Sequence, residues 1–259
     1  MDYNYHTHTP FCHHASEDPE EYVKRALECG ITKMGFSDHF PFRFPDGFEK
    51  SWRIQTTEAQ DYVSLVRELG EKYKGIIDIK LGFEMEYYPD LFGSMISDAR
   101  AYGADYLILG QHFINSEWDY PKNVHSVLPT DSVDMLVGYV DAVVEAMGVG
   151  VFTYVAHPDI INFTGDIDIY KCQMRRICEA SCKYDIPLEI NFLGIREKRI
   201  YPRDTFFELV GQTGAYVTFG LDAHKAEHAY DGQSLAFAKE IVEKYSLNYI
   251  GAPKLKPII

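Results

Sequence analysis

Long apolar segments are missing from this sequence. Although 46% of its 259 residues are hydrophobic, no apolar run approaches the roughly 20 residues that a membrane-spanning helix needs. The first residues, MDYNYHTHTPFC, contain neither the basic segment nor the apolar segment of a signal peptide. We therefore expect a cytoplasmic protein that does not associate with membranes.

Positive charge is also scarce. The chain has 25 lysines and arginines against 39 aspartates and glutamates, which gives a net charge of −14 at pH 7. Nucleic-acid binding draws much of its affinity from lysine and arginine on phosphates, so this composition argues against a dedicated DNA- or RNA-binding protein. Some of the carboxylates can instead be ligands for cations, and ten histidines add to the available ligands.

The five cysteines do not form a disulfide pattern. Their number is odd and no CxxC pair occurs, so a disulfide framework is not expected. Cys178 and Cys182 are four residues apart, which places them on one face of a helix as small buried residues. Cys12 differs because it lies among histidines.

No linker, low-complexity tract or block of charge divides the chain, so we expect one domain over residues 1–259. Short β-rich segments alternate with amphipathic ones, an order that favours parallel strands joined by helical crossovers. No glycine-rich phosphate loop follows the first strand, which weakens an open nucleotide-binding sheet as the alternative. The predicted fold is α/β, a distorted seven-stranded (β/α) TIM-like barrel. We expect strands at residues 2–5, 33–37, 76–83, 106–109, 152–156, 187–190 and 215–219, and helices at 18–30, 58–73, 90–102, 131–147, 169–184, 203–211 and 233–245.

Each predicted strand ends in side chains that can bind a metal ion or hydrogen-bond to a residue that does. The carboxyl ends of barrel strands converge on one mouth, where active sites lie. A set repeated around the barrel is therefore hard to explain by core packing. The pairs, in strand order, are His6 and His8, Asp38 and His39, Glu84 and Glu86, Gln111 and His112, His157 and Asp159, Glu189 and Asn191, and Asp222 and His224.

The spacing within these pairs suits metal binding. Strand residues two apart point the same way, so His6 and His8 can bind one ion, and Asp222 and His224 share that relation. Mixed imidazole and carboxylate ligands suit zinc, manganese or iron better than magnesium or calcium.

Each residue taken singly has an ordinary explanation. A lone HxH is a weak signal, Asp38-His39 can cap a helix, and His157-Pro-Asp159 can be a turn. We expect Glu189 and Asn191 to orient ligands rather than bind metal. His125 and His228 are expected to face solvent, and only one of the adjacent His13 and His14 is expected to point inward.

Taken together, these motifs resemble the PHP family, named for polymerase and histidinol phosphatase. The resemblance runs from His6-Thr-His8-Thr9 to Asp222-Ala-His224 and implies a seven-stranded barrel that binds three divalent metal ions. Its implied ligand sets are His6, His8, Glu84 and Asp222 for one ion; Glu84 as a bridge with His112 and His157 for a second; and His14, His39 and His224 for a third.

Two further motifs are similar to the histidinol-phosphate phosphatase branch. The opening histidines are followed by Cys12-His13-His14, and Glu189-x-Asn191 is followed by Gly194, Arg196 and Tyr201-Pro202. The resemblance implies hydrolysis of a small phosphate monoester, L-histidinol phosphate, by a metal-bridging hydroxide in histidine biosynthesis. We assign catalytic roles to Asp222, His224 and Arg196. Arg196 would bind the substrate phosphate, with Arg199 as a competing candidate.

The chain departs from this branch at Gln111, at His13 and over residues 115–129, which leaves other small phosphates such as nucleotides or sugar phosphates open. An amidohydrolase barrel also begins with HxH, but it usually needs a lysine on strand four, where this chain has His112. A non-catalytic metal-binding barrel is the third alternative. For the mechanism, Asp159 is a candidate proton donor, and Glu86 a candidate partner for a cationic group of the substrate.

Overall fold

The computed structural model describes residues 1–115, 117–118 and 123–258. Its regular elements begin where local side chains favour them. Asp18 accepts a hydrogen bond from Glu20 N (2.9 Å) and precedes a proline, which starts α1. Part of the divergent segment 115–129 lies outside the described residues.

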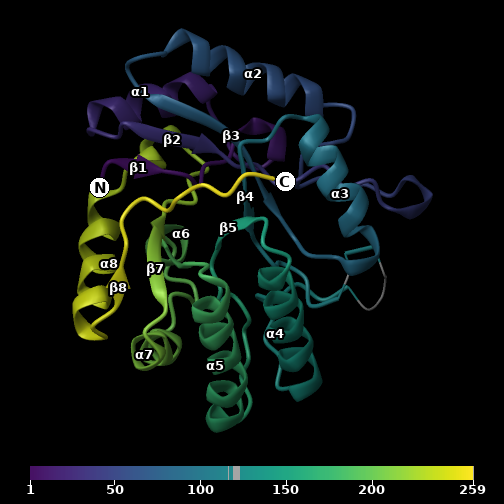
Figure 1. Cartoon of the computed structure of the whole chain (residues 1–259), viewed down its shortest axis with the longest axis vertical. Helices are drawn as coiled ribbons and strands as arrows, with labels where there is room; N and C mark the ends of the chain where they lie inside the picture. Colours follow the sequence, from purple (N-terminus) through teal and green to yellow (C-terminus); the bar gives the residue numbers. More distant parts are fainter. Residues whose placement is uncertain (116, 119–122, 259) are drawn as a thin grey trace.

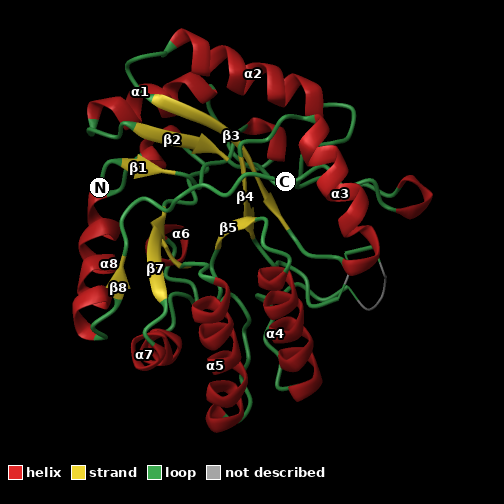
Figure 2. Ribbon diagram, in the orientation of Figure 1, coloured by secondary structure: helices red, strands yellow, loops and turns green. Residues whose placement is uncertain are grey.

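The described residues form a parallel sheet in which each strand pairs with the next in chain order. Figure 1 and Figure 2 show this sheet curled, with the helices outside it. The strands are β1 Tyr3–Asn4, β2 Lys33–Phe36, β3 Asp78–Met85, β4 Tyr106–Leu109, β5 Phe152–Val155, β6 Leu188–Asn191, β7 Tyr216–Gly220 and β8 Asn248–Tyr249.

Most of the helices lie between consecutive strands, as parallel pairing requires. The α-helices are α1 Pro19–Glu28, α2 Ala59–Lys72, α3 Pro89–Ala101, α4 Val133–Gly148, α5 Ile167–Tyr184, α6 Phe192–Arg196, α7 Asp204–Thr213 and α8 Gly232–Lys244. Three 3-10 turns, η1 Pro10–Cys12, η2 Pro45–Gly47 and η3 Ala226–Ala229, follow β1, β2 and β7. Among the described residues, no helix combines the length and the apolar character that crossing a lipid bilayer requires.

The first and seventh strands meet beyond their ends. Thr7 forms a parallel bridge with Ala223, where His8 N donates to Ala223 O (2.9 Å) and Ala223 N donates to His6 O (3.2 Å). The Tyr3 hydroxyl also lies 2.9 Å from the Thr218 hydroxyl. The two ends of the predicted barrel are thus held together at the mouth, which brings His6 and His8 beside Asp222 and His224.

The sequence-based fold is confirmed at the level of a curled, parallel α/β sheet, but the strand number differs. The sheet has eight strands rather than seven, because β8 pairs with the outer side of β7 through Tyr216 and Val217. This strand is two residues long and exposed, so it has no hydrophobic alternation to reveal it. The short helix α6 was also not predicted.

The core is continuous and apolar except at the strand ends. All four residues of β4, and all four of β5, are buried, as expected for strands covered on both faces. The histidines and carboxylates at the carboxyl ends are almost equally buried. Burial of so many polar groups in one place needs a compensating interaction.

Candidate metal centre

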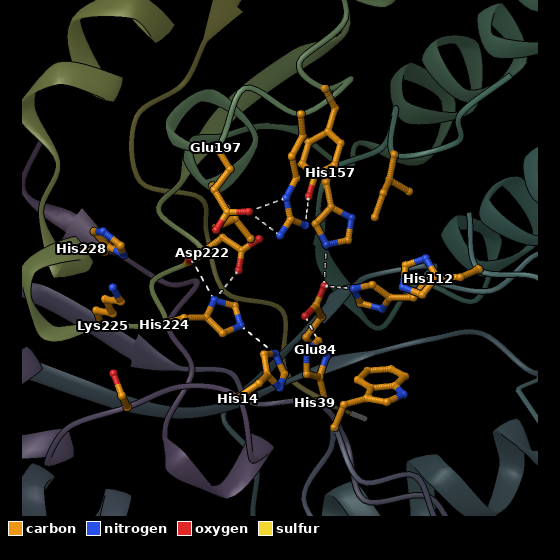
Figure 3. Close-up of a pocket in the computed structure, with 17 residues that line it drawn as sticks. His14, His39, Glu84, His112, His157, Glu197, Asp222, His224, Lys225 and His228 are labelled. Carbon is orange, nitrogen blue, oxygen red and sulfur yellow. Dashed lines mark hydrogen bonds and ion pairs between the residues drawn. The ribbon is translucent and has the colours of Figure 1, made fainter. Parts of the chain in front are cut away.

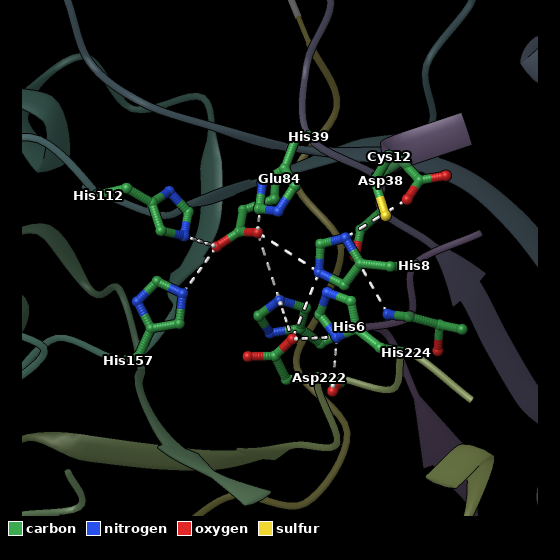
Figure 4. Close-up of polar contacts among 12 residues, drawn as sticks. His6, His8, Cys12, Asp38, His39, Glu84, His112, His157, Asp222 and His224 are labelled. Carbon is green, nitrogen blue, oxygen red and sulfur yellow. Dashed lines mark hydrogen bonds and ion pairs between the residues drawn. The ribbon is translucent and has the colours of Figure 1, made fainter. Parts of the chain in front are cut away.

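Glu84 lies at the middle of a ring of histidines (Figure 4). Its Oε1 is 2.8 Å from His157 Nε2 and 3.4 Å from His112 Nε2. Its Oε2 is 3.1 Å from His39 Nδ1 and 3.5 Å from His8 Nε2, with His6 Nε2 at 3.6 Å. One carboxylate therefore faces imidazoles from four different strand ends.

Asp222 is the second carboxylate in this cluster. Its Oδ1 lies 3.4 Å from His8 Nε2, 3.7 Å from His6 Nε2 and 3.3 Å from His224 Nδ1. His224 Nε2 in turn lies 2.9 Å from His14 Nε2. The predicted inward histidine is His14, whereas His13 faces the half-buried Glu58 (3.0 Å). The structure thus brings together all nine residues expected as metal ligands, which are His6, His8, His14, His39, Glu84, His112, His157, Asp222 and His224.

The unpaired atoms of this cluster fit metal ions. Both ring nitrogens of His8, together with His6 Nε2 and His39 Nδ1, are buried without a hydrogen-bond partner. Such atoms are rare because desolvation is costly. Ligand atoms of His6, His8 and Asp222, and of His6, Glu84 and His157, lie within 4.8 Å of one another. This mixture of nitrogen and oxygen donors suits zinc, manganese or iron.

The electrostatics favour positive charge at the same place. Burial would raise the pKa of Glu84, but His112 and His39 hold that pKa well below its usual range. The pKa of Asp222 is also held low against burial, chiefly by His6 and His8. Burial opposes the charge of His6, yet Glu189 and Asp222 raise its pKa to about 10. A protonated imidazole or a bound cation therefore compensates the buried carboxylates.

A second layer of acidic and amide groups orients the cluster. Glu189 accepts from His6 Nδ1 (2.7 Å), from His157 N (2.8 Å) and from Asn191 Nδ2 (2.8 Å). Asn191 Nδ2 also donates to Asp222 Oδ2 (3.0 Å). Both residues thus hold candidate ligands in place, as the sequence suggested.

Glu86 belongs to this layer as well. It is fully buried and accepts from His112 Nδ1 (2.9 Å), so the idea that it receives a substrate cation at the mouth is wrong. Asp159 is similarly buried and accepts from Arg203 N. It does not line the cavity, so it lacks access to a leaving group.

A cavity of about 390 Å³ opens over the cluster (Figure 3). Glu84, Asp222 and five of the candidate histidine ligands form part of its lining. Its remaining walls are Ser16, Trp52, His125, Ile160, Leu193, Glu197, Arg199, Tyr201, Lys225 and His228. His125 and His228 therefore do not simply face solvent as expected. Burial lowers the pKa of His125 to about 4, so its ring is neutral.

The two candidate phosphate arginines are placed differently. Arg196 ends α6 and donates to Asp222 O (3.0 Å) and to Asp231 (3.4 Å), outside the lining of the cavity. Arg199 lines the cavity, where it donates to the Tyr201 hydroxyl (3.0 Å) and pairs with Glu197 (2.6 Å). The structure therefore favours Arg199 over Arg196 as the arginine that reaches a bound substrate.

Several residues of the site were missed because no motif marks them. Trp52 and Lys225 line the cavity, and Arg53 lies buried behind it. Glu197 also lines the cavity, and its position next to Arg196 in the sequence is a signal that could have identified it. Of the two cysteines expected to be buried, Cys178 is buried but Cys182 is exposed.

Fold and site together define a class: parallel α/β barrel-like proteins that gather histidines and carboxylates at the carboxyl ends of their strands. A comparison with family models matches residues 4–192 to the PHP domain. The chain belongs to the PHP domain family.

Two relatives match most of the chain. It is 25% identical over 223 residues to a Deinococcus radiodurans protein named "Probable histidinol-phosphatase", with 85% of each chain covered. It is 24% identical over 249 residues to the histidinol-phosphatase of Bacillus subtilis, covering 85% of this chain and 92% of the relative.

A solved structure shares the fold. Histidinol phosphate phosphatase from Lactococcus lactis, complexed with zinc, L-histidinol and phosphate, superposes with a TM-score of 0.73 at 19% identity. The match covers 99% of this chain and 97% of the other. At this identity the likeness concerns the fold.

Proposed function

We propose that this protein is a metal-dependent phosphate monoester hydrolase that acts on L-histidinol phosphate in histidine biosynthesis. The observation that carries the proposal is the pair of ionised carboxylates, Glu84 and Asp222, shared among histidines at the floor of a substrate-sized cavity. Two relatives named as histidinol-phosphatases support the choice of substrate.

The nine clustered residues would hold up to three ions of zinc, manganese or iron. His6, His8 and Asp222 would share one ion, Glu84 would bridge toward His112 and His157, and His14, His39 and His224 would hold the third. When bound, such ions supply a Lewis acid for phosphoryl oxygens and lower the pKa of water. The protein's own part is to fix the ligands, bind the substrate and limit access of solvent.

Arg199 is our candidate for binding the phosphate. Its guanidinium lies in the cavity and is anchored by the Tyr201 hydroxyl, whose ring is itself buried. Arginine can donate two parallel hydrogen bonds to a phosphate. Arg196 would act indirectly, by holding the carbonyl of Asp222.

Glu197 is our candidate for the substrate's ammonium group. In L-histidinol phosphate, the carbon that bears the ammonium is bonded to the carbon that bears the phosphate ester. The substrate therefore presents a positive and a negative charge close together. The Arg199–Glu197 ion pair presents the opposite charges side by side in the cavity. Trp52 and the neutral His125 supply a flat surface near His112 for the imidazole ring.

The test is phosphate release by the metal-saturated protein, with L-histidinol phosphate beside nucleotide and sugar monophosphates. We expect preferential turnover of L-histidinol phosphate that a chelator removes and added metal restores. Preference for another phosphate would retain the hydrolase and reject the substrate. Absence of chelator-sensitive turnover on every phosphate would reject the hydrolase and favour a non-catalytic metal-binding barrel.

A further inference from the structure

A buried arginine lies directly behind the metal centre. The Arg53 side chain is 1% exposed, and its guanidinium carbon lies over the rings of Phe42 and Trp52, 4.2 and 4.3 Å from their centroids. Burial of a full charge is unfavourable unless partners compensate it, and an apolar side chain would fill the same space without that cost. The identity of its partners therefore bears on why an arginine occupies this position.

The hydrogen-bond partners of Arg53 connect it to two candidate metal ligands, His39 and His112. Arg53 Nη1 donates to the carbonyl of Phe40 (2.7 Å), the residue that follows His39. Arg53 Nη2 donates to Glu86 (3.3 Å), which accepts the Nδ1 proton of His112 (2.9 Å). The same guanidinium also pairs with Glu117, which lies in the connection between β4 and α4.

Both histidines face the same carboxylate. With Nδ1 engaged by Glu86, His112 presents Nε2 to Glu84 Oε1 at 3.4 Å. His39 presents Nδ1 to Glu84 Oε2 at 3.1 Å. The indole of Trp52, the neighbour of Arg53, packs edge-on against both rings, at 4.8 Å from His39 and 5.6 Å from His112.

We propose that Arg53 is a positioning residue for the metal centre, which holds His39 through the Phe40 carbonyl and His112 through Glu86. The role rests on the proposed metal binding. A planar guanidinium can donate to the Phe40 carbonyl and to Glu86 at the same time, whereas a lysine ammonium cannot donate to both with the same geometry. Loss of Arg53 releases the two histidines and leaves Glu86 and Glu117 buried without their cation.

The experiment measures zinc affinity and stoichiometry by competition with a chromophoric chelator, for the wild type and for Arg53→Met, Arg53→Lys and Glu86→Gln. Loss of a partner that orients a metal ligand typically weakens binding by about 10–100-fold. We expect a loss of this size for Arg53→Met and Glu86→Gln, confined to the ions that His39 and His112 bind. Arg53→Lys should restore part of the affinity, since it still pairs with Glu86.

The matched control is Arg67→Met, which removes an arginine paired with Asp105 (2.8 Å) on the surface and should keep wild-type affinity. Cobalt substitution gives a second readout, since its visible spectrum reports the ligand geometry independently of stability. If Arg53→Met does not fold, the nearly isosteric Glu86→Gln decides. Wild-type affinity and an unchanged cobalt spectrum in Glu86→Gln would overturn the role. A wild type that binds no zinc would overturn the metal centre itself, and the wild-type measurement alone reveals that case.

Discussion

At the scale of residues, two buried carboxylates, Glu84 and Asp222, organise the candidate metal centre. Glu84 alone faces His39, His112 and His157, and Asp222 alone faces His224. Both carboxylates lie close to His6 and His8, Glu84 at 3.6 and 3.5 Å and Asp222 at 3.7 and 3.4 Å. Each carboxylate also has its own contact, since Asn191 donates to Asp222, and Glu84 Oε1 lies 2.8 Å from His157 Nε2. Substitution of either one should therefore affect several candidate ligands together.

Asp222→Asn tests this dependence. The amide keeps the shape of the side chain but loses the negative charge that His6 and His8 face. We expect kcat/KM to fall by about 1,000-fold, equivalent to about 4 kcal/mol of transition-state stabilisation. Circular dichroism should remain that of the wild type. A loss of activity that occurs only through unfolding would count against the proposed role.

Glu197→Gln tests recognition of the ammonium group. The change should lower kcat/KM for L-histidinol phosphate about 10-fold more than for p-nitrophenyl phosphate, which has no ammonium. The estimate is modest because Glu197 is half exposed. Glu227→Gln is the control, since this exposed glutamate does not line the cavity. Equal losses on the two substrates would remove Glu197 from substrate recognition.

At the scale of elements, glycines at the strand ends make room for the buried carboxylates. A side-chain carbon at Gly110, just beyond β4, would overlap the carboxylate of Glu84. One at Gly220, the last residue of β7, would overlap Glu189. The ends of these strands therefore need glycine so that the centre can fit between them.

Gly110→Ala should displace Glu84 and weaken metal binding and turnover together. Gly138→Ala is the matched control, because this helical glycine in α4 has only an ordinary contact with Ile114 at 3.7 Å. Alanine there should be neutral or stabilise by about 0.5–1 kcal/mol. Metal titration and thermal melting of both variants check this pair of expectations. Unchanged metal affinity in Gly110→Ala would show that the position of Glu84 does not determine metal binding.

The elements also show how far sequence alone leads. Period, capping residues and alternation predicted β1 to β7 and the seven longer helices within a few residues, because these signals are local. The two-residue β8 and the five-residue α6 carry too few residues for a periodic signal. Arg53, Trp52 and Lys225 were missed for another reason. Their roles arise from long-range packing against Phe42, Glu86 and the cavity, which no spacing in the chain records.

At the scale of the whole molecule, Glu117 links stability to pH. Burial raises the pKa of its carboxyl to about 7, with Arg53 opposing and Glu86 reinforcing this shift. An unfolded glutamate titrates near about 4.3. Between about pH 4.3 and about pH 7, the folded state therefore retains a proton that the unfolded state has released. The contribution of Glu117 to the free energy of unfolding is full below about pH 4.3 and is lost as the pH rises through about 7.

Glu117→Gln removes this dependence. As the pH rises from about 5 to about 8, the variant should gain up to about 3 kcal/mol in free energy of unfolding relative to the wild type. Urea denaturation of both proteins at the two pH values, with chelator present throughout, measures the difference without a contribution from metal release. A constant difference between the proteins would mean that Glu117 does not change its protonation in this range.

Metal binding should also be a large part of the stability of the whole molecule. Without ions, the fold keeps Glu84, Asp222 and several unpaired histidine nitrogens away from water, so the folded state should bind ions far better than the unfolded chain. One ion at 100 times its dissociation constant would stabilise the folded state by about 2.7 kcal/mol, which corresponds to about 5–10 °C in Tm for a chain of this size. Chelation should lower Tm by at least this amount and added zinc should restore it, whereas Asp222→Asn should show a smaller shift. An unchanged Tm after the ions have been removed would mean that the barrel tolerates its buried carboxylates unaided, and that the ions serve chemistry alone.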